Sequence, residues 1–266
     1  MPLITARIPD NWEELEDLIQ AILAECGMKA TRQVTIKLPR GSVDVDVLAE
    51  ETVDGITSIT VCECKNWKAR IPKEIVHACR TVMQETGANN GYIISREGFQ
   101  SGAIEAVAAT NINLVTFEQF QERFFEKWYR NRLWAIEDSL HGFHTYYEML
   151  GKPGYNRLTT DEERAAYDVV WDRHLFAGLM LMSFSPYSGL LKGGFRAPPL
   201  PFDVSKIVEM GADVPEAAQN VQGYRELLSV LEAAGKEGLA ELRKVNPITR
   251  DKETAQVAEK PLRFGE

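Results

Sequence analysis

The sequence predicts an α/β fold for about the first 120 residues, followed by a mostly α-helical domain. Apolar and polar residues alternate along much of 31–65, as they do in half-buried strands. Segments with helical spacing of apolar residues flank these strands, and the last strands alternate with helices. After Phe117 the chain becomes aromatic-rich and helical in pattern, which marks the start of the second part.

The elements of the first part are expected in the order α-β-β-β-α-β-α-β. Helices are predicted at 11–26, 72–86 and 101–110, and strands at 31–38, 43–47, 57–65, 91–95 and 113–116. Gly27 and Gly87 are suited to end helices, Pro72 to a first helical turn, and Asp54-Gly55 to a hairpin. Because strands that alternate with helices pair through crossovers, the last strands should be parallel, which gives a mixed sheet flanked by helices.

The second part is expected to contain helices at 118–150, 161–182 and 216–235. Thr159 or Thr160 can cap the second of these, and the Gly- and Pro-containing segment 185–201 should be irregular. The predicted domains are therefore 1–120 and 121–245, with 246–266 as a flexible polar tail. No motif is recognised in 121–245, so interaction, dimerisation and DNA recognition all remain open as its role.

Composition narrows the class of protein. Hydrophobic residues make up 44% of the chain, which is enough for a core, and no apolar run reaches the length of a membrane helix. The first residues lack the charged-then-apolar pattern of a secretion signal, so a cytoplasmic protein is expected. Net charge is −9, which argues against indiscriminate coating of nucleic acid but not against a DNA enzyme. The four cysteines lack the CxxC spacing of structural zinc sites, and a disulfide framework is not expected.

The third predicted strand, at 57–65, contains most of the side chains that could bind a metal ion or take part in catalysis. Glu63 and Lys65 point to one face of a strand, and Cys62 and Cys64 to the other. The preceding strand of the hairpin brings Asp46 alongside. Two carboxylates and the backbone carbonyl of Cys64 are oxygen ligands that suit Mg²⁺ or Mn²⁺, and Lys65 can stabilise charge on a phosphate or position water. The alternative interpretation is a solvated strand face with a cross-strand ion pair.

Several short motifs follow one another in a fixed order over about residues 12–120. They are Leu15-Glu16 ahead of Gly27, Val45-Asp46-Val47-Leu48, Glu63-Cys64-Lys65-Asn66-Trp67, Tyr92-Ile93-Ile94-Ser95, Gly98-Phe99, and the alanines of 103–109. Together they resemble the Mrr-type restriction endonuclease branch of the PD-(D/E)xK nuclease superfamily. No proline precedes the aspartate, which is common in this branch, and an acidic residue stands at 63 where relatives often have glutamine. The resemblance implies a restriction-endonuclease-like core.

The resemblance also implies roles for individual residues. Asp46, Glu63 and Lys65 would be the catalytic core, and Glu16 would orient a second metal ion or a water molecule. For Glu16 the alternative is an exposed position in an acidic helix. Asp44 lies on the same strand face as Asp46 and competes with it for the metal role, but the motif favours Asp46.

Two basic segments could contact DNA. Lys68, Arg70 and Lys73 follow the catalytic strand and can bind phosphates, or they can simply belong to a solvated loop. The segment 127–134 interleaves basic and aromatic residues, for which packing into a core or interface is the favoured interpretation. The segment 175–184 is apolar on all sides and should be buried.

The function expected from these observations is that of a Mg²⁺-dependent DNA endonuclease in restriction or anti-phage defence. A repair or recombination nuclease is one alternative, and a non-catalytic DNA-binding or scaffold module that keeps the fold is another. The expected partners are DNA, a second copy of the chain, since cutting both strands requires two sites, and a partner subunit of a defence system. No membrane partner is expected.

Overall fold

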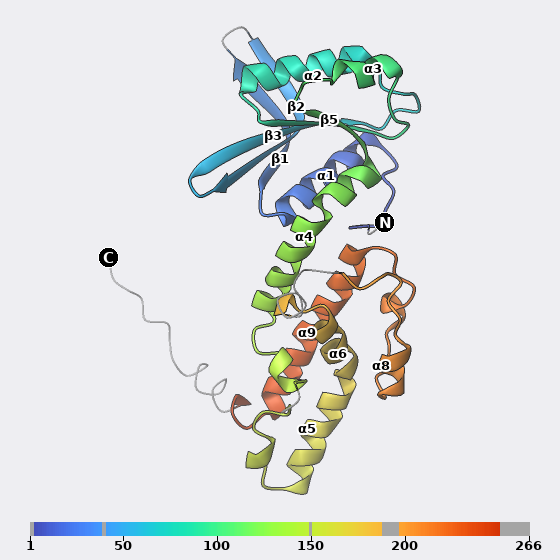
Figure 1. Cartoon of the computed structure of the whole chain (residues 1–266). Helices are drawn as coiled ribbons and strands as arrows, with labels where there is room; N and C mark the ends of the chain where they lie inside the picture. The colour runs from blue at the N-terminus through green and yellow to red at the C-terminus, as the bar shows by residue number, and fades with distance from the viewer. Residues whose placement is uncertain (1–2, 39–40, 149–150, 188–196, 251–266) are drawn as a thin grey trace, which may run out of the picture. The chain divides into compact units, whose positions relative to one another are not determined.

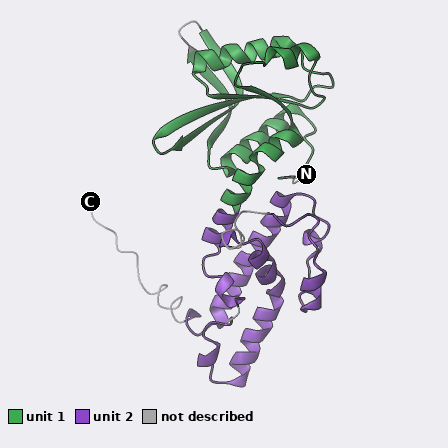
Figure 2. Ribbon diagram, viewed as in Figure 1, with its two compact units in different colours: residues 1–132 green, residues 133–266 purple. Residues whose placement is uncertain are grey.

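A computed structural model describes residues 3–38, 41–148, 151–187 and 197–250. The chain divides into two compact units, residues 1–132 and 133–266, which Figure 2 shows in different colours. Among the described helices, none combines the length and the apolar character that crossing a membrane would require.

The first unit contains one five-stranded sheet with the strand order β1-β2-β3-β4-β5. Strands β1 to β3 pair antiparallel, and β3, β4 and β5 pair parallel. The elements are α1 (Trp12–Glu25), β1 (Lys29–Leu38), β2 (Gly41–Val53), β3 (Ile56–Lys65), α2 (Lys73–Thr86), β4 (Asn90–Ser95), α3 (Ser101–Ala106), β5 (Ile112–Thr116) and α4 (Phe117–Ser139). This order and the mixed sheet confirm the predicted fold class.

Local sequence explains where these elements begin and end. The side chain of Asn11 caps α1 by accepting a hydrogen bond from the backbone N–H of Glu14 at 2.9 Å. Asp54 and Gly55 both have positive φ, of 51° and 80°, which is the backbone that a tight hairpin between β2 and β3 requires. Gly87 ends α2 in the left-handed conformation, with φ 68°.

Helices cover both faces of the sheet, as Figure 1 shows. Helix α2 packs on one face, where its Val76, Cys79 and Met83 join a buried core that includes Val61 of β3 and Ile93 of β4. Helix α1 lies against β1, β2 and β3. The start of α4 also packs on the sheet, since the ring of Tyr92 in β4 lies 5.4 Å from that of Phe120.

Most apolar residues of the segment 127–134 are buried, as predicted, although Trp134 is exposed. Trp128 is fully buried, and its indole N–H donates a hydrogen bond of 2.5 Å to the carboxylate of Glu25 at the end of α1. Lys127 forms an ion pair with Glu51 of β2, 2.5 Å apart. The basic and aromatic residues of this helix therefore hold it to the first unit.

The helices predicted at 101–110 and 118–150 are shorter in the structure. Helix α3 ends at Ala106, because the hydroxyl of Thr110 bonds to the carbonyl of Val107 and Ala109 takes a positive φ of 57°. Helix α4 ends at Ser139, and Gly142 with φ 86° breaks the segment that was predicted to continue to residue 150. A short 3₁₀ helix, η1 (His144–Tyr146), follows, and residues 149–150 lie outside the described part.

The second unit is helical, as expected. Its further elements are η2 (Tyr155–Arg157), α5 (Asp161–Arg173), α6 (Leu175–Ser183), α8 (Ser205–Glu209), η3 (Glu216–Ala218) and α9 (Tyr224–Val245). Thr160 caps α5. The single helix predicted at 161–182 is wrong, because the chain turns at His174, whose ring bonds to Glu241 at 2.9 Å.

The last helix lies further along the chain than predicted. The segment predicted as a helix at 216–235 begins with a 3₁₀ turn that Pro215 precedes, and α9 starts only after Gly223. The apolar segment 175–184 is mostly buried, as predicted, with Phe176 and Met180 in the core, although Met182 is exposed. Most of the predicted irregular segment 185–201 and residues 251–266 of the predicted tail lie outside the described residues, whereas Asn246 is described and buried.

Candidate active site

Asp46 lies where strands β2 and β3 stop pairing. Their antiparallel ladder ends at Val47, which is opposite Cys62. At the next position the side chain of Asp46 replaces the backbone partner, because its Oδ2 accepts a hydrogen bond of 2.8 Å from the N–H of Cys64. The apolar neighbours Val45 and Val47 are buried and anchor this part of β2. The carboxylate is therefore held beside β3 at the open end of the hairpin.

Lys65 connects this carboxylate to that of Glu63. The Nζ of Lys65 lies 3.3 Å from Oδ2 of Asp46, and the same ammonium forms an ion pair with Glu63. Strand β4 holds the other edge of β3 in parallel, with Glu63 opposite Ile93 and Lys65 opposite Ser95. The side chains of Lys65, Asp46 and Glu63 are 17%, 20% and 26% exposed, so solvent reaches the group although it is largely enclosed.

The electrostatics of the three groups are those of a crowded acidic site with one cation. Burial raises the pKa of Glu63, the neighbouring Asp46 raises it further, and Lys65 counteracts part of this rise. Burial alone would lower the pKa of Lys65, but the carboxylates of Glu63 and Asp46 raise it above its usual value. The lysine therefore stays protonated at neutral pH, and with both carboxylates ionised the group carries one net negative charge.

The donor set fits a hard divalent cation. Within the described residues, no cluster of three or more His, Cys, Asp and Glu side chains is arranged to hold a metal ion. The oxygen donors at this end of the hairpin are the carboxylates of Asp46 and Glu63 and backbone carbonyls such as that of Cys64, and hard cations accept oxygen ligands. Burial holds the pKa of the Cys64 thiol well above its usual value, so this side chain supplies no thiolate.

Glu16 lies on the buried side of α1, not on its exposed acidic face. Its side chain is 2% exposed, and its carboxylate accepts a hydrogen bond of 2.7 Å from Nε2 of Gln33 in β1. Burial raises the pKa of Glu16, Gln33 opposes that rise, and the charge of Asp46 adds to it. Glu16 is therefore close enough to the Asp46 group to interact with it, and the alternative of a solvated position is wrong.

Asp44, the competing carboxylate, has a different hydrogen-bond partner. It is exposed, and its Oδ1 accepts a hydrogen bond of 2.6 Å from the hydroxyl of Thr35 across the β1–β2 pair. The ion pairs of Lys65 are made with Asp46 and Glu63. The geometry thus favours Asp46, as the motif does.

The basic loop after β3 is exposed but anchored. Lys68, Arg70 and Lys73 are exposed, and none of them forms an ion pair with a described residue. Ile71 fixes the loop, because it is fully buried and its backbone bonds to Gly98 and Gln100 in the segment after β4. Three positive charges without an ion pair to a described residue therefore lie on an anchored loop that directly follows β3.

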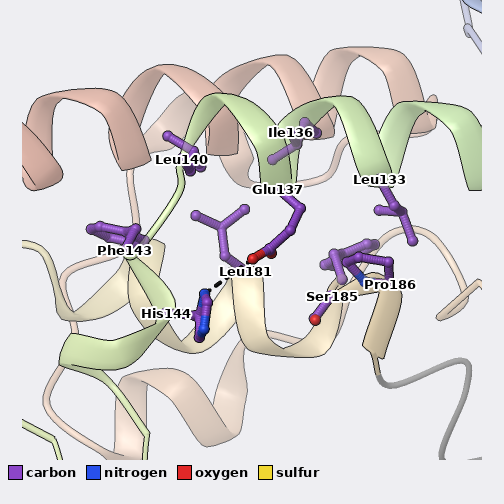
Figure 3. A pocket seen from close by; sticks show the side chains of 10 residues that line it. Leu133, Ile136, Glu137, Leu140, Phe143, His144, Leu181, Ser185 and Pro186 are labelled. Carbon is purple, nitrogen blue, oxygen red and sulfur yellow. Dashed lines mark ion pairs between the residues drawn. The ribbon is translucent and has the colours of Figure 1, made fainter.

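Two of the hollows among the described residues compete with this group as a candidate site. One, with an empty volume of about 380 Å³, opens at the carboxyl ends of β3 and β4 and is lined by Asn66, Ser95 and Arg96 together with apolar side chains. The other lies in the second unit and has an empty volume of about 330 Å³ (Figure 3). Its lining is mostly apolar, and Nδ1 of His144 lies 3.1 Å from the Glu137 carboxylate. Neither hollow gathers the carboxylates found around Lys65.

Sequence reasoning missed Gln33. Its amide is the hydrogen-bond donor to buried Glu16, and it occupies the position across from Asp46 in the β1–β2 register. The sequence pattern could not predict the hydrogen bond between Gln33 and Glu16, because a polar residue is ordinary in an alternating strand. The helix that contains Glu16 meets this strand only in the folded chain.

Comparison with known proteins places the first unit. Residues 10–124 match the family model described as a restriction endonuclease, Mrr_cat. A search of curated proteins found no match. A solved structure entitled "Crystal Structure of Protein of Unknown Function AF1548" aligns with 88% of this chain and 98% of its own, at 16% identity and a TM-score of 0.36. Residues 10–124, a little under half of the chain, are therefore similar to the Mrr-type restriction endonuclease domain, consistent with a PD-(D/E)xK nuclease fold.

Proposed function

We propose that the first unit hydrolyses phosphodiester bonds of DNA with Mg²⁺ or Mn²⁺, as an endonuclease in restriction or anti-phage defence. One observation carries the proposal: Asp46, Glu63 and Lys65 converge at the point where β2 leaves β3. The matching family is one of restriction endonucleases, which supports DNA as the substrate and defence as the setting.

Each residue has a role that follows from its environment. Asp46, Glu63 and the backbone carbonyl of Cys64 would hold the cation, which when bound polarises the phosphate and lowers the pKa of water. Lys65 stays protonated between the two carboxylates, so it can donate hydrogen bonds to a phosphate oxygen as negative charge develops there. Glu16 would orient water or a second ion from the α1 side.

The remaining parts would bind and recognise the substrate. Lys68, Arg70 and Lys73 would contact phosphates next to the scissile bond, since they are exposed, uncompensated and close in sequence to Lys65. The helical part, assigned from the sequence as residues 121–245, would supply target recognition, a partner surface or dimerisation. Cutting both strands would then use two copies of the chain.

Plasmid cleavage tests the proposal. Supercoiled and linear plasmid would be incubated with Mg²⁺ or Mn²⁺ and wild type, Asp46→Asn, Lys65→Ala or Asp44→Asn. Asp44→Asn is a matched control, because it removes the same charge from the same strand at an exposed position without contact to Lys65. We expect wild type and Asp44→Asn to cut at similar rates, and the other two to lose cleavage by at least about 100-fold. Equal losses for Asp44→Asn and Asp46→Asn would contradict the assignment.

A further inference from the structure

The backbone of Gln33 departs from the strand that contains it. Its φ is 50°, in the left-handed region that residues other than glycine rarely adopt in a strand. Its neighbours Arg32 and Val34 pair normally with Val47 and Val45 of β2, but the Gln33–Asp46 pair between them is missing from the ladder. The irregularity therefore lies directly across from the central carboxylate of the candidate site.

Packing does not account for this conformation. Gln33 is exposed, so no buried apolar contact of its own side chain compensates for the unfavourable backbone. Glycine would adopt the same φ freely, and the residue present is a long amide instead. An exposed non-glycine residue in this conformation points to a requirement for its side chain.

The contact that the side chain makes is with Glu16. Nε2 of Gln33 donates a hydrogen bond of 2.7 Å to Oε2 of Glu16, whose side chain is 2% exposed. Arg32 also approaches Glu16, with Nε 3.5 Å from Oε2, and it forms an ion pair with Asp17. Gln33 is thus a neutral donor that fixes one oxygen of a buried carboxylate whose electrostatic neighbours include Asp46 and Lys65.

We propose that Gln33 is a positioning residue of the active site: its left-handed backbone aims its amide at Glu16 and interrupts the β1–β2 ladder opposite Asp46. Both carboxylates are then oriented by one residue of the edge strand. This inference rests on the proposed nuclease function, because its consequence is a slower cleavage step.

The test compares Gln33→Gly, Gln33→Ala and a control, Gln20→Ala. Gln20 also links α1 to β1, because its Nε2 donates to the carbonyl of Ala30 at 3.1 Å, and this hydrogen bond involves none of the carboxylates of the site. Cleavage of supercoiled plasmid would be measured under single-turnover conditions with Mn²⁺. DNA affinity would be measured separately with Ca²⁺, and thermal unfolding in metal-free buffer.

We expect both Gln33 variants to cleave about 10- to 100-fold more slowly than wild type with unchanged DNA affinity. Gln33→Gly should unfold a few degrees above Gln33→Ala, because glycine accepts the positive φ without strain. Gln20→Ala should cleave at the wild-type rate. Rates that follow thermal stability across the variants, or a Gln33→Gly protein as fast as wild type, would overturn the proposal.

A double variant shows whether Gln33 acts through Glu16. The substitution Glu16→Gln keeps an oxygen that can accept the hydrogen bond but removes the charge that Gln33 positions. In that background Gln33→Gly should cause less than about a twofold further loss of rate. If the rate loss of the double variant equals the product of the two single losses, Gln33 acts independently of Glu16 and the inference is overturned. In that case the proposed function still holds, because wild type cleaves. An inert wild type would overturn both.

Discussion

Replacing Lys65 with methionine should abolish cleavage and yet strengthen binding of a divalent cation. The Nζ of Lys65 lies 3.3 Å from Oδ2 of Asp46, so a cation bound to that oxygen at about 2.1 Å would be no more than about 5.5 Å from the ammonium. The repulsion between a double and a single positive charge at this distance is about 1.5 kcal/mol in water, and it is larger where the site is enclosed. Loss of the lysine should therefore tighten Mn²⁺ binding at least about tenfold.

Calorimetric titration of Mn²⁺ into both proteins at pH 8 measures this difference. The pH matters because the pKa of Glu63 is already raised, and removing Lys65 raises it further. Lys68→Met is the matched control, since it deletes the same charge from an exposed position outside the ion pairs and should change the Kd less than about twofold. Equal or weaker Mn²⁺ binding by Lys65→Met would refute the placement of the lysine beside the cation.

Three further predictions concern pH, DNA and packing. The pKa of Glu63 is higher in the folded than in the unfolded protein, so its contribution to stability falls as pH rises from about 4.5 through the folded value. The free energy of unfolding in urea, measured without metal, should thus fall less over that pH range for Glu63→Gln than for wild type. An equal fall in both proteins would contradict this. Arg70→Gln should lower the salt dependence of DNA affinity by about one unit of log–log slope, whereas Lys127→Gln, already in an ion pair, should leave it unchanged. Trp128→Phe should lower the free energy of unfolding by about 2–3 kcal/mol, and Trp67→Phe, at an exposed position, by about 0.5 kcal/mol or less. Similar losses for both variants would refute the packing of α4.

The sheet and the site were predictable because their signals are local. Alternation along β2 and β3 and the Asp54-Gly55 turn fix the hairpin, and the hairpin places Asp46 beside Glu63 and Lys65. The motif then chose Asp46 over Asp44, which agrees with the ion pairs of Lys65.

The features that were missed depend on contacts distant in sequence or on backbone geometry. Helix α4 stops at Ser139 although the aromatic pattern continues, because Gly142 turns the chain. The helix predicted at 161–182 breaks at His174, whose partner Glu241 lies on α9, 67 residues further along. The left-handed backbone of Gln33 could not be predicted from its residue type, because glutamine does not favour that conformation.

The proposed site depends on the convergence of Asp46 and Glu63 around Lys65. The most direct test is therefore to locate the position at which a divalent cation binds. Crystals of wild type and of Asp46→Asn would be soaked with Mn²⁺ at pH 8, and the ion located by its anomalous scattering. We expect a peak in wild type within coordination distance of both carboxylates, and its loss in Asp46→Asn. A peak bound at Asp44, or one that persists unchanged in Asp46→Asn, would contradict this expectation.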